Sequence, residues 1–236
     1  MNYYPRYRIS FGGPLTPAVK SILIACGITF LLQLIAGEKM IFIFGLIPVL
    51  VWKDFFIWQL GSYIFLHGGL FHLLFNLFAL FMFGCELERL WGSRFFIKYF
   101  FITGVGAGIS TAVFNPSMTI PTVGASGAVF GILMAYALYY PNRIVYFNFI
   151  FPIKIKYLVL IYGVLTFYFS FSDTGGNIAH IAHLGGMLFG FVYLKFYFFK
   201  GFVKQQILKL KIKRLRRRFH VVDKNKKDRD DETNHY

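Results

Sequence analysis

The sequence has few charged residues and very few acidic ones. Only 15% of its 236 residues are charged, whereas soluble domains carry roughly 25%. Hydrophobic residues make up 57% of the chain, and several apolar runs reach the length of about 18 residues at which a helix can cross a bilayer. This composition excludes a soluble domain. We therefore expect an all-α polytopic membrane protein, with room for about six transmembrane helices in one membrane domain.

Cysteines and intramembrane carboxylates are also scarce. Cys26 and Cys85 lie in or beside apolar runs, which predicts free thiols rather than a disulfide framework. The acidic residues nearest to the apolar runs, Glu86, Glu88 and Asp173, lie at their ends. A carboxylate-dyad hydrolase and a proton-coupled transporter are therefore disfavoured. An H-E-x-x-H metalloprotease motif is absent as well, so we expect neither a metal nor another cofactor.

The apolar runs define the predicted layout. The expected spans are residues 17–37, 69–85, 95–114, 124–140, 155–171 and 177–199. The connection 38–68 is amphipathic and rich in tryptophan, which is typical of segments that lie in the membrane interface. The predicted divisions are a polar lead (1–16), a membrane domain (17–199) and a basic tail (200–236).

Lysine and arginine gather on one side of this layout. The three connections on the other side carry only Lys39 and Lys53. The positive-inside rule then places both termini in the cytoplasm. A short chain of this kind, without an appended folded domain, suggests a bacterial inner membrane.

The tail carries much of the positive charge, with 13 of the 25 lysines and arginines from Lys200 onward. Leu208, Ile212, Leu215 and Phe219 recur at helical spacing between basic residues, a pattern common in helices that lie on anionic lipid. A solvated cytosolic helix stays open as an alternative, and nucleic acid is not an expected partner. Residues 224–236 are expected to be disordered.

Small residues repeat every four positions on two of the spans. Gly127, Gly131 and Ala135 do so on the fourth span, and Gly186 and Gly190 on the sixth. Small side chains at this spacing let membrane helices approach closely. We therefore expect the fourth and sixth spans to pack face to face.

A serine stands where the fourth span begins. Ser126 lies between Gly124 and Gly127, and Pro116 and Pro121 prevent the helix from extending upstream. The span is only about 17 residues long, short of the ~20 needed to cross a bilayer. Ser126 should therefore lie below the membrane surface, as a helix cap or as a nucleophile.

Other spans carry amide and imidazole side chains, for which a functional role is the default hypothesis within a membrane. His72 and Asn76 are four residues apart on the second span, and His180 and His183 are three apart on the sixth. A histidine can take the proton of a serine hydroxyl near neutral pH. The sequence thus predicts a nucleophile, Ser126, and a base on the sixth span.

His183 is the predicted base because it is central to the face that carries Gly186 and Gly190. The Ser126 backbone N–H, free in the first turn of its helix, and the side chains of His72 and Asn76 could stabilise an oxyanion. An interhelical hydrogen bond is the structural alternative for His72 and Asn76.

Three motifs resemble those of the rhomboid family of intramembrane serine proteases. They are Gly-Ala-Ser-Gly at 124–127, His-Gly-Gly-Leu-Phe-His-Leu-Leu-Phe-Asn at 67–76, and Ala-His-Leu-Gly-Gly at 182–186, followed by Gly190. A Glu88-x-x-x-Gly92 element follows the second span. The motifs occur in the family's order, and the resemblance covers roughly residues 17–198.

The resemblance implies a six-transmembrane-helix rhomboid-like bundle with a water-filled cavity. Ser126 would be the nucleophile and His183 the base of a dyad without an acid, while His72 and Asn76 match the oxyanion residues and His67 a structural histidine. The implied substrates are membrane-anchored proteins, cut in or near a transmembrane segment.

Two positions depart from the family pattern. Trp52-Lys53 stands where many relatives have Trp-Arg, and lysine cannot reproduce a planar guanidinium fork. Phe130 stands where some members stack a tyrosine on the catalytic histidine. The alternatives to a protease are an inactive relative that binds transmembrane helices and, with less support, a channel or carrier. The oligomeric state is not specified by the sequence.

Overall fold

The structure is a computed structural model that describes residues 13–147, 150–171 and 177–232. The contacts divide the chain into two compact units, one ending at Val192 and the other beginning at Tyr193. The boundary predicted between residues 199 and 200 stays a prediction. Asp173, expected at the edge of the sixth span, lies outside the described residues.

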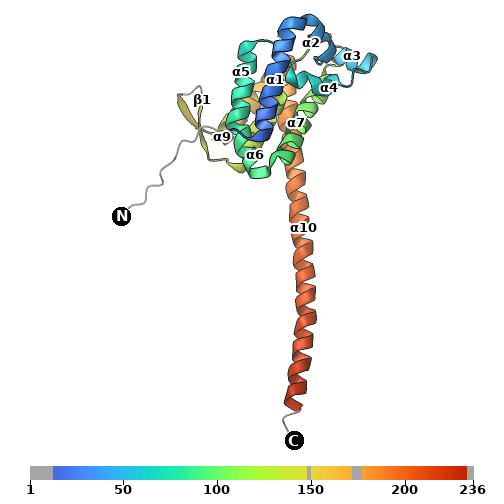
Figure 1. The fold of residues 1–236 in the computed structure, drawn as a ribbon, viewed down its shortest axis with the longest axis vertical. Helices are drawn as coiled ribbons and strands as arrows, with labels where there is room; N and C mark the ends of the chain where they lie inside the picture. The colour runs from blue at the N-terminus through green and yellow to red at the C-terminus, as the bar shows by residue number, and fades with distance from the viewer. Residues whose placement is uncertain (1–12, 148–149, 172–176, 233–236) are drawn as a thin grey trace, which may run out of the picture. The chain divides into compact units, whose positions relative to one another are not determined.

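Helices form nearly all of the first unit, as Figure 1 shows. The main helices are α1 (Pro17–Ala36), α5 (Leu70–Ala79) with the π-helical turn η2 (Leu80–Gly84) and α6 (Cys85–Trp91), α7 (Ser93–Phe114), α8 (Ser126–Tyr139), α9 (Ile155–Phe169) and α10 (Asn177–Glu232). The helices begin close to the starts of the predicted spans, but the second helical segment continues to Trp91 instead of residue 85 and α10 continues beyond residue 199. The predicted disorder of 224–236 is contradicted as far as Glu232, because α10 continues to that residue.

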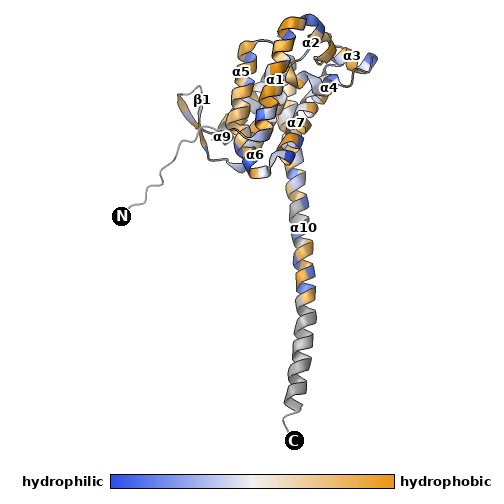
Figure 2. Cartoon of the chain, in the orientation of Figure 1, coloured by the Kyte–Doolittle hydropathy of each residue, from blue (hydrophilic) through white to orange (hydrophobic). Residues whose placement is uncertain are grey.

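Four of the described helical segments are long and apolar enough to cross a membrane: Pro17–Ala36, Leu70–Trp91, Ser93–Phe114 and Ala179–Lys200. Two shorter apolar helices, Ser126–Tyr139 and Ile155–Phe169, complete the set. Figure 2 shows α1 and α5 largely in the colours of hydrophobic residues. The predicted all-α polytopic membrane fold is confirmed, and the protein is a multi-pass integral membrane protein.

The connection between α1 and α5 is an ordered loop of short helices. These are α2 (Glu38–Phe44), α3 (Pro48–Lys53), α4 (Gln59–Ser62) and the 3-10 turn η1 (Tyr63–Phe65). Trp52 Nε1 donates a hydrogen bond of 2.8 Å to the backbone oxygen of Ala112, near the end of α7. The indole of the Trp52-Lys53 pair therefore attaches this loop to the bundle.

A second connection contains structure that the hydrophobic pattern did not predict. Between α8 and α9 the chain forms an antiparallel hairpin of β1 (Ile144–Phe147) and β2 (Phe151–Lys154). Its strands have only four residues each, too few for a period-two pattern to stand out from the apolar sequence around them.

The helix α7 lies at the centre of the bundle. In the most apolar part of α7, 61% of the residues are buried, whereas 28–33% are buried in the other three long segments. It packs on α8, α6, α1 and the loop helices α3 and α4. Tyr99 on α7 donates a hydrogen bond of 2.7 Å to the backbone oxygen of Gly131, which ties this central helix to α8.

Glycines set the distance between α8 and α10. A Cβ atom added to Gly186 would lie 1.9 Å from the backbone oxygen of Gly127, and one added to Gly190 would lie 3.3 Å from the Cα atom of Gly131. Only residues without a side chain allow this approach. The predicted face-to-face packing of the fourth and sixth spans is therefore confirmed.

Glu88 fixes the start of α1 against α6. Its carboxylate accepts hydrogen bonds from the backbone N–H groups of Ala18 (2.8 Å) and Val19 (2.9 Å), which lie in the first turn of α1, and from the hydroxyl groups of Thr16 and Ser93. A carboxylate at a helix N-terminus satisfies free N–H groups and complements the helix dipole. Glu88 is thus a structural residue.

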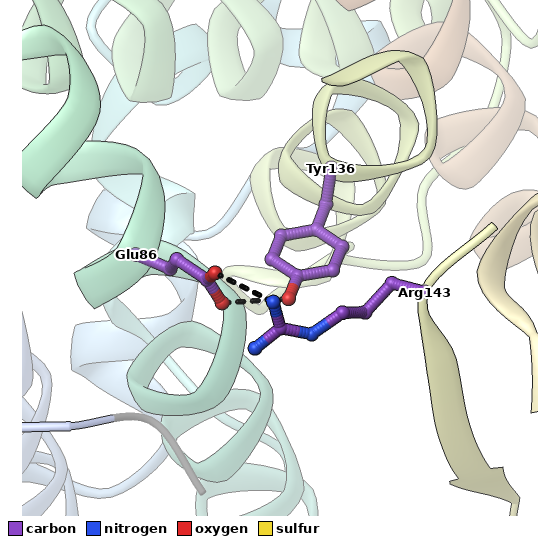
Figure 3. Close-up of polar contacts among 3 residues, drawn as sticks. All are labelled: Glu86, Tyr136 and Arg143. Atoms are coloured by element: carbon purple, nitrogen blue, oxygen red, sulfur yellow. Dashed lines mark hydrogen bonds and ion pairs between the residues drawn. The ribbon is translucent and has the colours of Figure 1, made fainter. Parts of the chain in front are cut away.

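A second carboxylate joins three elements at the same end of the bundle. Figure 3 shows Glu86 of α6 with Tyr136 of α8 and Arg143, which precedes β1. The Tyr136 hydroxyl donates a hydrogen bond of 2.6 Å to Glu86, and Arg143 forms an ion pair with Glu86 at 3.4 Å. We call this the basic end of the bundle, because Arg89 lies in the last turn of α6, Lys154 precedes α9 and Lys156 lies in the first turn of α9.

Candidate active site

The loop before α8 delivers Ser126 to the first position of that helix. Leu46 and Thr122 form an isolated antiparallel bridge, with N–H to O distances of 2.9 and 2.8 Å, which holds this loop against the α1–α5 connection. Gly124 then adopts a φ of +126°, a conformation that residues with a side chain rarely adopt. This turn leaves Ser126 partly exposed at the start of α8.

His183 lies within hydrogen-bond distance of this serine. Its Nε2 atom is 2.8 Å from Ser126 Oγ, although the two residues are 57 positions apart. The glycine contacts between α8 and α10 explain the distance, since Gly186 lies one turn after His183 on the same helix. A serine hydroxyl paired with an imidazole is an arrangement that can supply an activated nucleophile.

An aromatic ring lies against His183. Phe130, one turn after Ser126 on α8, stacks on the imidazole with ring centroids 4.1 Å apart and an interplanar angle of 12°. Tyr162 of α9 contacts the edge of Phe130 at 5.7 Å. The two rings limit the orientations open to His183, so three helices contribute to its position.

The other histidine of α10 lies elsewhere. His180 stacks on Phe169 of α9 with centroids 5.4 Å apart, and its ring is 6.4 Å from that of His183. Of the two histidines that the sequence offered as bases, the structure brings His183 to Ser126.

His72 lies against the loop that carries Ser126. A Cβ atom added to Gly124 would lie 2.7 Å from His72 Cε1 and 2.8 Å from Nε2, so the imidazole fills the space that a side chain would need. The Gly68 N–H donates a hydrogen bond of 3.3 Å to His72 Nδ1. In a neutral ring the proton must then be on Nε2, the nitrogen that faces Gly124.

Asn76 lies one turn further along α5 and is buried. Its Nδ2 atom donates a hydrogen bond of 2.9 Å to the backbone oxygen of His72. An amide nitrogen carries two hydrogens, so one donor can point elsewhere while this bond is kept. The bond fixes the rotamer of Asn76 on the face of α5 that also carries His72.

His67 is enclosed by the loop and by α1. Its backbone N–H and oxygen both bond to the Gln33 amide, at 3.1 and 2.7 Å, and its ring meets that of His72 with centroids 5.3 Å apart. Burial, and secondarily the nearby His72, lowers the pKa of His67 to about 4. His67 is thus neutral near pH 7, and its position fits the structural role implied by the resemblance.

The structure also identifies polar residues that the sequence analysis did not single out. Gln33 on α1 holds His67, and Gln59, which is fully buried, bonds to the backbone of Ile47 and Phe42 in the loop. Tyr63 accepts the Gly124 N–H through its backbone oxygen at 3.0 Å. A glutamine side chain in an apolar segment costs free energy unless it is hydrogen-bonded. The presence of isolated glutamines in such segments was therefore the sequence signal that could have identified Gln33 and Gln59.

The chemistry of the site is that of a hydroxyl and an imidazole. Within the part of the chain that the structure describes, no group of three or more His, Cys, Asp or Glu side chains is arranged to hold a metal ion. Cys26 and Cys85 are buried free thiols. The arrangement can support nucleophilic attack by Ser126, with His183 as the proton acceptor.

Comparison with known proteins gives consistent matches. Residues 54–200 match the family profile described as Rhomboid domain. The rhomboid protease GluP of Bacillus subtilis (strain 168) is 38% identical over 136 residues, covering 57% of this chain and 25% of GluP. YdcA, a rhomboid family protein of the same organism, is 31% identical over 178 residues, covering 70% of this chain and 85% of YdcA.

A plant protein is similar as well. RHOMBOID-like protein 1 of Arabidopsis thaliana is 34% identical over 146 residues, which cover 58% of this chain and 35% of the plant protein. The chain thus spans a quarter of GluP and about a third of the plant protein, but most of YdcA. The profile covers more than half of the chain and includes Ser126 and His183. This multi-pass integral membrane protein therefore belongs to the rhomboid family.

Proposed function

We propose that this protein is an intramembrane serine endopeptidase that uses Ser126 and His183 as a catalytic dyad. The observation that carries the proposal is the 2.8 Å approach of His183 Nε2 to Ser126 Oγ. Both side chains are partly exposed, which is required of groups that must meet a substrate. The proposed mechanism requires no metal or other cofactor.

Acylation begins with proton transfer. His183 Nε2 takes the Ser126 hydroxyl proton while Oγ attacks the carbonyl carbon of the substrate peptide bond, which forms a tetrahedral intermediate. The imidazolium then gives this proton to the departing amine. The C–N bond breaks, and the acyl group remains as an ester on Ser126.

The negative charge on the tetrahedral oxygen needs hydrogen-bond donors that are already in place. The Ser126 N–H belongs to the first turn of α8, where N–H groups lack helical partners. The His72 proton on Nε2 faces the Gly124 turn, and Asn76 supplies an amide donor from the same face of α5. These three groups form the proposed oxyanion site.

Deacylation repeats the sequence with water. His183 takes a proton from a water molecule, whose oxygen attacks the ester carbonyl, and returns the proton to Ser126 Oγ as the ester C–O bond breaks. Because α8 begins only at Ser126, a loop instead of a further helical turn precedes the nucleophile. We propose that water reaches the acyl ester from this side.

The proposed substrates are membrane-anchored proteins cut in or near a transmembrane segment, with small residues at the cut. The proposed location is the inner membrane of a bacterium with both termini in the cytoplasm, which the distribution of lysine and arginine supports. GluP, which is named a rhomboid protease, supports the same class of activity.

Labelling of the purified protein with a fluorophosphonate, which reacts covalently with activated serines, tests the dyad. Wild type is expected to be labelled, while Ser126→Ala and His183→Ala lose labelling by at least a hundredfold, in line with the loss of a nucleophile or its base. His180→Ala is the matched control and is expected to retain labelling, because its ring does not reach Ser126.

Cleavage of a membrane-anchored reporter completes the test. The reporter should be cut by wild type and by His180→Ala, and should remain intact with Ser126→Ala. Turnover by a pure Ser126→Ala preparation would overturn the assignment. A folded wild type that is neither labelled nor active would instead favour an inactive relative that binds transmembrane helices.

A further inference from the structure

A groove on the side of the bundle lies outside the candidate active site. It is formed by α8, α9 and α10 and has a volume of about 610 Å³. Its lining residues are Met134, Ala137, Leu138, Lys156, Val159, Leu160, Gly163, Val164, Phe167, Leu184 and Met187. Every one of them is apolar except Lys156. All belong to the compact unit that ends at Val192.

The groove opens toward the surrounding lipid. Leu160, Val164 and Phe167 line it along α9 and are 58–62% exposed, as expected of side chains that face a membrane. Met187 forms part of its floor and is only 4% exposed. Gly163 leaves the space above this floor open, because an added Cβ atom would be 4.0 Å from Met187 Sδ.

The length of the groove matches one leaflet of a bilayer. Lys156 is in the first turn of α9 and Phe167 is near its last turn, and the 11 steps from one to the other along the helix correspond to a rise of about 16 Å. Half of a typical hydrocarbon core is ~15 Å. With its polar end at the level of the headgroups, the groove is long enough for an acyl chain of one leaflet, and its apolar end lies past the middle of α9.

The dimensions of the groove suit an acyl chain better than a helix. A volume of about 610 Å³ spread over about 16 Å gives a cross-section of about 40 Å². A helix with its side chains is ~10 Å across and requires about twice this area. An extended acyl chain is thinner than a helix and has no polar atoms to satisfy, so it fits both the size and the lining.

Lys156 defines the chemistry of the polar end. Its ammonium group also lies 5.1 Å from the centroid of the Tyr157 ring, so a cation and an aromatic ring meet at the headgroup level. Arg143, at the same basic end, is paired with Glu86. The phosphate of either kind of lipid complements the Lys156 charge, but in a zwitterionic headgroup a neighbouring ammonium offsets the phosphate charge, so the net attraction is greater for an anionic lipid.

We propose that the groove between α8, α9 and α10 is a binding site for one anionic phospholipid, with an acyl chain along α9 and the headgroup phosphate at Lys156. In a membrane the acyl chain gains little from leaving other lipids, because lipid tails are as apolar as the groove. The preference for an anionic lipid therefore comes from Lys156. One such charge corresponds to about a fivefold preference.

Photoactivatable lipids test this site on the full-length protein. Phosphatidylglycerol and phosphatidylcholine with the same diazirine-bearing acyl chain are placed separately in nanodiscs, and the crosslinked residues are mapped by mass spectrometry. Wild type should show about fivefold more phosphatidylglycerol adducts on the groove residues of α9 and α10. Mapping separates this signal from any lipid bound at the basic tail.

Two variants and one matched control complete the experiment. Lys156→Gln should make the two lipids equal in the groove, whereas Lys154→Gln, at an exposed residue outside the lining, should keep the preference. Gly163→Leu should remove adducts of both lipids from the groove alone. Equal labelling by the two lipids in wild type, or an unchanged preference in Lys156→Gln, would overturn the proposal.

Discussion

The orientation of His183 depends on packing. In the best-known serine proteases a buried carboxylate holds the imidazole in place. Here the described partners of the His183 ring are the Ser126 hydroxyl, the Phe130 ring and the more distant His180 ring. A stacked ring restrains the plane of an imidazole without adding charge. The dyad geometry therefore depends on how closely α10 approaches α8.

Gly186→Ala tests this dependence at a single residue. The new Cβ atom would lie 1.9 Å from the backbone oxygen of Gly127, so α10 must shift away from α8. We expect a loss of stability of about 1–3 kcal/mol, typical of overpacking, together with loss of fluorophosphonate labelling as His183 leaves Ser126. Thermal unfolding in detergent and labelling at low temperature measure the two effects.

Gly27→Ala is the matched control for the same change of residue. Gly27 lies in α1, and an added Cβ atom there would meet nothing within 4 Å. Because alanine is a better helix former than glycine, this variant should be as stable as wild type or slightly more so. Labelling retained at the wild-type level in Gly186→Ala would show that the dyad does not depend on this contact.

At the scale of elements, the loop between α1 and α5 is held by few polar side chains. Gln59 is fully buried; its Oε1 accepts the Ile47 N–H and its Nε2 donates to the Phe42 oxygen, both at 2.9 Å. The same loop pairs with the segment before Ser126 through Leu46 and Thr122. Its order therefore bears on the position of the nucleophile.

Gln59→Leu keeps the size of the side chain and removes its hydrogen bonds to the Ile47 N–H and to the Phe42 and Ile43 oxygens. The Ile47 N–H and the Phe42 oxygen are then left without this partner, at a cost of about 1–3 kcal/mol for each buried group. We expect faster hydrogen exchange in α2, α3 and α4 and unchanged exchange in α7. Hydrogen exchange followed by mass spectrometry resolves the two regions.

Ser62→Ala provides the comparison within the same loop. Ser62 donates a hydrogen bond of 2.7 Å to the Phe44 oxygen but is partly exposed, so water can replace it. Its exchange pattern should stay close to that of wild type. If the exchange rates of Gln59→Leu matched those of Ser62→Ala, the buried Gln59 amide would not be the group that orders the loop.

The helices were predictable because apolar length and glycine spacing are local signals. The start of α8 near Ser126 follows from Pro116, Pro121 and the glycines of the 124–127 motif, and the packing of α8 on α10 follows from small residues at four-residue intervals. To predict the pairing of Ser126 with His183, only this helix packing and the choice between His180 and His183 were needed.

Other features depend on contacts that no local pattern encodes. The β1–β2 hairpin is made of apolar residues that resemble the spans on either side. Gln33 and Gln59 form hydrogen bonds with backbone groups of residues distant in the sequence. A single amide in an apolar run does not indicate which group it will bond. Phe130 is one phenylalanine among 31, and only the resemblance singled it out.

At the scale of the whole molecule, charge is distributed unevenly along the chain. The formal net charge is +15, and 13 of the 25 lysines and arginines lie from Lys200 onward. In the second compact unit, Leu208, Leu210 and Ile212 are 42–62% exposed and alternate with Lys209, Lys211 and Lys213. A helical segment that presents apolar and basic side chains together can bind anionic lipid through both.

A fluorescent probe on Lys209→Cys tests whether this segment lies on lipid. Cys26 and Cys85 are buried, so a polarity-sensitive thiol label is directed to the new cysteine. In nanodiscs with phosphatidylglycerol the emission should shift to the blue relative to phosphatidylcholine, and 1 M salt should reverse the shift, since the Debye length falls to about 3 Å. The same label on Lys39→Cys, in α2, should not respond to salt. Equal emission of the tail probe in the two lipids would instead show a solvated helix, and the positive charge would then act on partners in solution.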